Sequence, residues 1–197
     1  LIIAKRDRPV RVKFVNSLPT GAAGNLFIPV DTSLMGAGAG PGAVPGTNCN
    51  TVPKPASCYT ENRATLHLHG GNTPWISDGT PHQWTVPVGQ ATPYQKGVST
   101  RDVPDMPPTG NGQMTFYWTN QQSGRLMFYH DHSYGITRLN VYAGEAAGYL
   151  LVDPEEDAMI NSGVLPNLGG IYRYGIPLVI QDKTFVPANI VSKPVVG

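Results

Sequence analysis

Two stretches decide the interpretation of this chain, Thr65–Gly79 (TLHLHGGNTPWISDG) and Tyr129–His132 (YHDH). They hold four of the five histidines, and each pair is spaced His-x-His. Side chains alternate between the two faces of a β-strand, so residues two apart point to the same side. The pairs are His67 with His69 and His130 with His132. Two such pairs that converge would form a metal site of four imidazoles.

The residues around both pairs are typical of β-strands. In the first stretch, apolar Ala64, Leu66 and Leu68 alternate with Thr65, His67 and His69. Such alternation predicts a strand with one face packed against a core and the other face turned toward a ligand. In the second stretch, Leu126 and Phe128 share the face of the histidines, so apolar side chains lead into the site.

Surface histidines are the alternative explanation, because histidine is common on protein surfaces and a single His-x-His is a weak signal. Two period-2 pairs on predicted strands favour metal binding instead. His82 lies between Pro81 and Gln83 without such a partner, and we interpret it as a surface residue.

Composition narrows the class of protein. A length of 197 residues suits one domain and the start of a second. The formal charge of +1 offers no electrostatic field for nucleic acid or for a membrane surface. Charged residues make up 14%, against about 25% in typical domains, so the surface is uncharged polar or partly covered by something else. No apolar run approaches the roughly 20 residues that span a bilayer.

The two cysteines, Cys49 and Cys58, lie nine positions apart without the Cys-x-x-Cys spacing of zinc or thioredoxin motifs. We favour a local disulfide that closes a Gly- and Pro-rich surface loop spanning 36–55. It would imply an oxidising compartment, extracellular or periplasmic. Two free thiols in a mobile loop are the alternative.

The remaining pattern predicts an all-β sandwich with antiparallel strands. Strands are expected at 10–16, 84–88, 113–119 and 146–152, and the third should pair with the second histidine strand as a hairpin. Asp153 and Pro154 predict the start of a connector helix. We expect one domain over 1–165, followed over 166–197 by a linker and a strand of a second domain at 176–181.

The motifs HLHGG, SDG, YHDH and TRLNVYAG, in this order, resemble the first cupredoxin domain of a multicopper oxidase, in the branch of laccases and bilirubin oxidases. The resemblance covers most of the chain from Val10 to Phe185. It implies a cupredoxin-like, antiparallel Greek-key β-sandwich or barrel with a short helical connector. It also implies that an opening strand and the remaining cupredoxin domains of the oxidase lie outside this sequence.

The resemblance implies copper as the cofactor, in the type 2 and type 3 ions of a trinuclear cluster. By position, His67 would bind the type 2 copper, His69 and His130 one type 3 copper, and His132 the other. Asp78, in the SDG motif, matches an acidic residue that assists proton delivery. A turn-forming aspartate before Gly79 is the alternative for Asp78. Asp131 alternates away from the metal face, and the sequence assigns it no role.

The implied function is that of the N-terminal part of a laccase-like oxidoreductase. The cluster would reduce O2 to water while a small molecule or metal ion is oxidised at a type 1 copper elsewhere. The sequence contains no His-Cys-His for that copper, so we expect the fragment alone to be inactive. One alternative is a self-contained copper carrier with a mononuclear four-His site. Another is a zinc hydrolase, although no obvious Glu base lies near the first pair.

Overall fold

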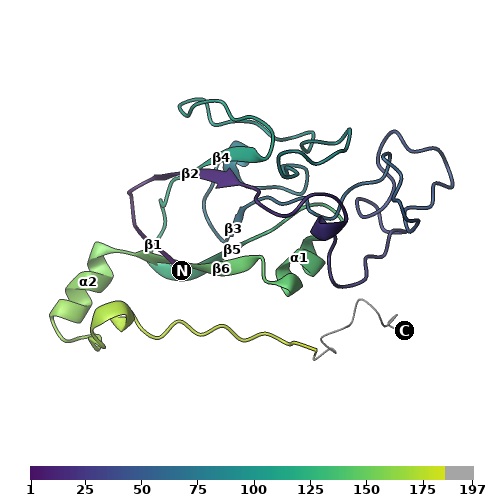
Figure 1. Cartoon of the computed structure of the whole chain (residues 1–197). Coiled ribbons are helices and arrows are strands. Elements are labelled where there is room, and N and C mark those ends of the chain that lie inside the picture. The colour runs from purple at the N-terminus through teal and green to yellow at the C-terminus, as the bar shows by residue number, and fades with distance from the viewer. Residues whose placement is uncertain (185–197) are drawn as a thin grey trace.

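The computed structural model describes residues 1–184, which form two β-sheets layered on one another (Figure 1). The larger sheet has the order β1-β6-β5-β3, and the smaller sheet pairs β2 with β4. The strands are β1 Ile2–Lys5, β2 Val10–Val15, β3 His67–His69, β4 Gln113–Trp118, β5 Arg125–His130 and β6 Ala146–Val152. The α-helices are α1 Thr137–Ala143 and α2 Pro154–Asn161, and short 3-10 helices span Gly21–Gly24, Trp75–Ser77 and Gly170–Tyr172. The predicted two-layer β-sandwich is confirmed, although the described strands do not close into a barrel.

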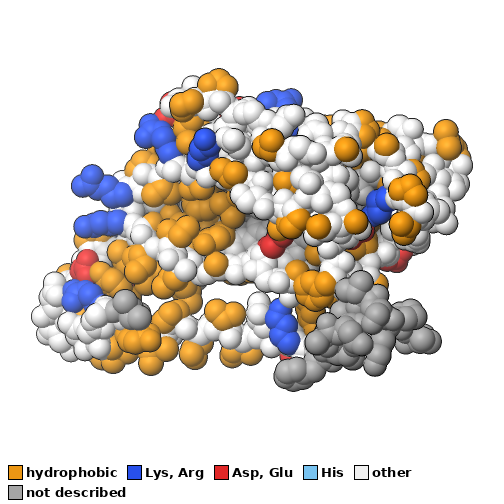
Figure 2. All heavy atoms as spheres, viewed as in Figure 1, with side chains coloured by type: hydrophobic (Ala, Val, Ile, Leu, Met, Phe, Trp, Pro, Cys, Tyr) orange, Lys and Arg blue, Asp and Glu red, His pale blue; other side chains and the backbone are white. Residues whose placement is uncertain are grey.

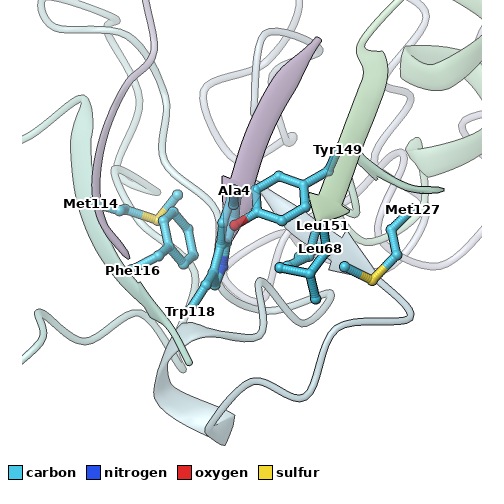
Figure 3. Close-up of a cluster of buried hydrophobic side chains, with 8 residues drawn as sticks. All are labelled: Ala4, Leu68, Met114, Phe116, Trp118, Met127, Tyr149 and Leu151. Atoms are coloured by element: carbon cyan, nitrogen blue, oxygen red, sulfur yellow. The ribbon is translucent and has the colours of Figure 1, made fainter. Parts of the chain in front are cut away.

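The core lies between the two sheets and is built from alternate residues of their strands (Figure 3). Trp118 is at its centre, with its ring 5.4 Å from that of Tyr149 in an edge-to-face contact. Such aromatic pairs stabilise a core beyond the area they bury. The buried members are Ala4, Leu68, Met114, Phe116, Trp118, Met127, Tyr149 and Leu151. Because β5 contributes Met127 inward, its neighbours Leu126, Phe128 and His130 lie on the outward face.

One predicted pairing is wrong. The structure pairs β4 antiparallel with β2, in the register Val12 to Phe116, and places β5 between β3 and β6. Residues 119–124 therefore cross from one layer to the other instead of forming a hairpin turn. Asn120 adopts a left-handed conformation at the crossing, and its side chain bonds Arg8 and Tyr149.

Two further expectations need correction. The larger sheet is not wholly antiparallel, because β1 pairs with β6 in parallel. The strand expected at 84–88 is reduced to isolated bridges from Thr85 to Ala64 and Lys96. Pro87 has no backbone N–H and cannot extend this ladder.

The connector helix α2 begins as predicted. Asp153 caps it by accepting hydrogen bonds from the backbone N–H groups of Glu155 and Glu156, at 2.8 and 3.0 Å. Pro154 occupies the first turn, where its missing N–H costs nothing.

The predicted disulfide between Cys49 and Cys58 is present, with a Cα–Cα distance of 5.8 Å. Both cysteines are buried, at 3% and 1% exposure. The expectation that the bridge lies on the surface is therefore wrong. It joins two parts of the long loop to each other.

Residues 176–181 form no regular strand and are exposed. The end of the proposed 166–197 segment, from residue 185 onward, lies outside the described residues. Within residues 1–184, no helix combines the length and apolarity that crossing a membrane requires.

Candidate metal centre

The two histidine pairs meet because β3 and β5 are neighbouring strands. Their antiparallel register places His67 opposite His130 and His69 opposite Phe128. The ring centroids lie 5.4 Å apart for His67 and His130, 4.9 Å for His67 and His132, and 5.3 Å for His69 and His130. The structure therefore brings all four predicted histidines together.

Backbone carbonyl groups fix the tautomers of two of the rings. His67 Nδ1 lies 2.6 Å from the carbonyl oxygen of Asp78, and His130 Nδ1 lies 2.5 Å from that of Asp131. A carbonyl oxygen only accepts hydrogen bonds, so each Nδ1 carries the proton and donates it. In the neutral form of either ring, Nε2 then carries the lone pair that can bind a metal.

The remaining nitrogens converge on one region. His69 Nδ1 lies 3.1 Å from His130 Nε2. Ligand nitrogens of His67, His69 and His130 all lie within 4.8 Å of one another. Two imidazole nitrogens that each bind one ion at about 2.0 Å lie about 3 Å apart, so the observed pair suits a shared ion. His132 Nδ1 is buried and has no hydrogen-bond partner among the described residues. This all-imidazole donor set fits copper.

The surroundings of the site lower the pKa of two of its histidines, His130 and His132. Burial lowers the pKa of His130, and the neighbouring imidazoles lower it further. Burial also lowers the pKa of His132, with His67 as the next contribution. A depressed pKa leaves the imidazole unprotonated at neutral pH, and only the unprotonated ring can bind a metal.

Asp78 follows the 3-10 turn Trp75–Ser77 and touches the site in two ways. Its backbone carbonyl holds the His67 ring, and its carboxylate lies 3.6 Å from His67 Nδ1. Thr73 Oγ1 donates to that carboxylate at 2.6 Å. Gly79 has φ +64° and lies against the backbone of Leu66, where a side chain would collide. The SDG turn therefore packs against the start of the first histidine strand. This position is compatible with a role of Asp78 in proton delivery and with a role as a turn-forming residue.

His82 does not join the cluster. It is exposed, and its ring lies 4.8 Å from that of Tyr134. The interpretation of His82 as a surface residue is confirmed.

The sequence alone missed Asp131. This residue is buried, and its carboxylate accepts hydrogen bonds from segments on both sides of the site. Two features of the sequence draw attention to Asp131: it stands between two histidines, and the LNVYAG motif that contains Asn140 follows it. Neither feature reveals which groups donate hydrogen bonds to its carboxylate.

The face of the sheet that carries the histidines is apolar and open. Phe128 stacks on His69 with ring centroids 4.6 Å apart, yet it remains 43% exposed. Leu126 and Ile3 are 45% and 53% exposed. Figure 2 shows a further gathering of hydrophobic side chains between the two layers of strands, on a side of the molecule where no histidine is visible. Exposed apolar surface of this kind marks a place where other protein packs.

Comparison with known proteins agrees with the site. The chain is 33% identical over 186 residues to a laccase of Bacillus subtilis and 35% identical over 185 residues to a laccase of Bacillus stratosphericus. Each alignment covers 93% of this chain and 27% of the relative. A solved laccase from Pediococcus acidilactici matches 80% of the chain and 20% of its own, with 16% identity and a TM-score of 0.45. No family model matches the chain.

The chain combines a cluster of histidines on a β-sandwich with similarity to laccases over 93% of its length. Together these features indicate a copper-dependent class of protein. The chain belongs to the multicopper oxidase family, as its motifs predicted. It spans about 27% of the length of the curated laccases it matches, and family membership implies copper as its metal.

Proposed function

We propose that this chain provides half of the histidine ligands of a trinuclear copper cluster in a laccase-like oxidase. The observation that carries the proposal is the half-formed character of the site. The ligand nitrogens of three histidines converge and the ring of His132 lies beside them, while the sheet face around them is apolar and exposed, as Leu126 and Phe128 illustrate. The remaining donors would come from the other cupredoxin domains of the oxidase, packed on this face.

The division of ligands follows the resemblance. His67 would hold the type 2 copper, His69 and His130 one type 3 copper, and His132 the other. The 3.1 Å separation of His69 Nδ1 and His130 Nε2 supports a shared ion for that pair. Copper, when bound, supplies one-electron chemistry suited to reducing O2 to water.

The chain's own residues hold and orient the ligands. The Asp78 and Asp131 carbonyls fix the rings of His67 and His130 with Nε2 exposed for coordination. The Asp78 carboxylate, half-buried beside His67, is our candidate for moving protons to the site. The reducing substrate would be a small molecule or a metal ion, oxidised at a type 1 copper in another domain.

The domain organisation and the compartment belong to the same proposal. Residues 1–165 would form the first cupredoxin-like domain, and residues 166–197 the linker and first strand of a second. The buried disulfide between Cys49 and Cys58 supports an oxidising compartment, extracellular or periplasmic.

A self-contained copper carrier is the second candidate, because the ligand nitrogens of three histidines already lie within 4.8 Å of one another and the ring of His132 lies beside that of His67. The two functions differ in copper content and spectrum. The oxidase, purified from its native gene, should contain several coppers and absorb in the near ultraviolet through its type 3 coppers. A carrier would bind one ion without that band.

Substitution tests the ligand assignment in the oxidase. We expect His69→Ala or His132→Ala to lose type 3 copper and O2 consumption while the circular dichroism spectrum is kept. His82→Ala is the matched control, since its ring is exposed outside the cluster, and it should retain both. O2 consumption that survives in the His69 or His132 variant would contradict the proposal.

A further inference from the structure

Asp131 is the most completely bonded side chain beside the metal centre. It is 2% exposed, and its carboxylate accepts four hydrogen bonds, two on each oxygen. Oδ1 accepts from the Thr65 N–H at 2.9 Å and from Ser133 Oγ at 2.7 Å. Oδ2 accepts from the Ser133 N–H at 2.9 Å and from Asn140 Nδ2 at 2.9 Å. All four contacts therefore use this side chain as an acceptor, on both of its oxygens.

The donors belong to both segments that carry the histidines. Thr65 lies two residues before His67, and Ser133 directly follows His132. Asn140 of α1 donates to Asp131 and also to the carbonyl oxygen of Arg63, at 3.1 Å. One carboxylate therefore ties the first histidine segment, the second and the following helix together.

The strand ladder by itself provides little of this connection. β3 is only three residues long, so few backbone bonds fix its position against β5. The bond from Thr65 to Asp131 extends the attachment beyond the end of β3. The backbone of Asp131 acts on the site as well, because its carbonyl oxygen accepts from His130 Nδ1.

A buried positive charge balances the carboxylate. The Arg63 side chain lies almost entirely inside and donates to the carbonyl oxygens of Gly36, Thr60 and Tyr134. Burial lowers the pKa of Arg63 to about 10, while the charge of Asp131 raises it, so the guanidinium stays protonated at neutral pH.

We propose that Asp131 is a positioning residue that sets the distance between the two histidine pairs and thereby the copper affinity of the site. The inference rests on the proposed copper-binding function. An amide at this position would turn an NH2 group toward donors, and at least one of the four bonds would be replaced by a repulsive contact. The histidine pairs would then lose their common attachment.

The test compares two aspartate-to-asparagine variants of the full chain. In Asp131→Asn we expect Cu(II) affinity, measured by competition titration and electron paramagnetic resonance, to fall about 10- to 100-fold. Long-range ¹H–¹⁵N spectra should also show shifted His130 ring nitrogens, because the segment that supplies the carbonyl partner of His130 Nδ1 is no longer held by the side chain. Asp153→Asn is the matched control, because Asp153 is 6% exposed and accepts three backbone N–H bonds away from the histidines. Its affinity should stay within about twofold of the unsubstituted chain.

Each outcome has a separate meaning. Absence of Cu(II) binding in the unsubstituted chain would refute the proposed function itself. Binding by that chain with equal affinity in Asp131→Asn, or an equal loss in Asp153→Asn, would overturn the positioning role. Should Asp131→Asn fail to fold, Ser133→Ala removes one of the four bonds, and we expect about a fivefold loss of affinity. Unchanged affinity in that variant would overturn the inference too.

Discussion

Replacing Glu145 by glutamine should stabilise the domain at alkaline pH. Glu145 follows α1 and lines a cavity of about 460 Å³ whose walls include Phe14, Leu18 and Tyr129. Burial there raises the pKa of its carboxyl to about 8, and the negative charge of Asp131 adds to the effect. The native chain therefore keeps a proton on Glu145 at neutral pH, which the unfolded chain has already released.

The sign follows from proton binding in the two states. At pH values below the ordinary carboxyl pKa of 4.5, both states are protonated and no cost arises. As pH rises from about 4.5 to about 8, the unfolded state alone is ionised, so the free energy of unfolding falls. Above pH 8 the cost is complete. The full pKa difference corresponds to about 5 kcal/mol, and because the side chain keeps some solvent contact we expect about 2 to 3 kcal/mol.

Urea unfolding of the metal-free chain at pH 4.5 and pH 9 measures this cost. Glu145→Gln should match the unsubstituted chain at pH 4.5 and exceed its free energy of unfolding by about 2 to 3 kcal/mol at pH 9. Glu155→Gln is the control, because the Glu155 side chain is 78% exposed. If the two chains differed by the same amount at both pH values, the reasoning about Glu145 would be refuted.

Three further outcomes can be measured on the same chain. Cys58→Ser should lower the free energy of unfolding by about 2 to 3 kcal/mol, because it opens a nine-residue loop; calorimetry would show a reduced Tm, and an unchanged Tm would argue against the bridge. Asp153→Ala should cost about 1 kcal/mol through loss of the helix cap, measured by urea unfolding, whereas a neutral result would mean that the cap contributes nothing. The lowered pKa values of His130 and His132 mean that the unfolded state takes up protons first, so the metal-free chain should lose stability as pH falls below about 6.5; a His130→Gln and His132→Gln double variant should lose less over the same range.

The shared face of each histidine pair was predictable because it depends on a local rule. Strand periodicity puts His67 and His69 on one side, and likewise His130 and His132, without any knowledge of the fold. Apolar Phe128 on the same face was predictable for the same reason. The cap at Asp153 follows equally from local chemistry, since a short acidic side chain satisfies N–H groups two and three residues away.

Long-range arrangement was not predictable in this way. A short connection between two predicted strands suggested a hairpin, but residues 119–124 carry the chain from one sheet to the other. The sequence offers no local signal that distinguishes a turn within a layer from a crossing between layers. The bonds of Asp131 pose a similar problem, because its donors Thr65 and Asn140 are 66 and 9 residues away.

Arg63 holds the two ends of the loop that carries the disulfide, because its guanidinium donates hydrogen bonds to the carbonyl oxygens of Gly36 and Thr60. The residues between these two carbonyl groups form a loop whose ends are held together, and Val44 within it is 72% exposed. Lengthening a loop whose ends are already held together adds little to the entropic cost of closing it. This part of the chain is therefore suited to accept an inserted affinity tag or electrode tether, leaving the imidazole cluster undisturbed.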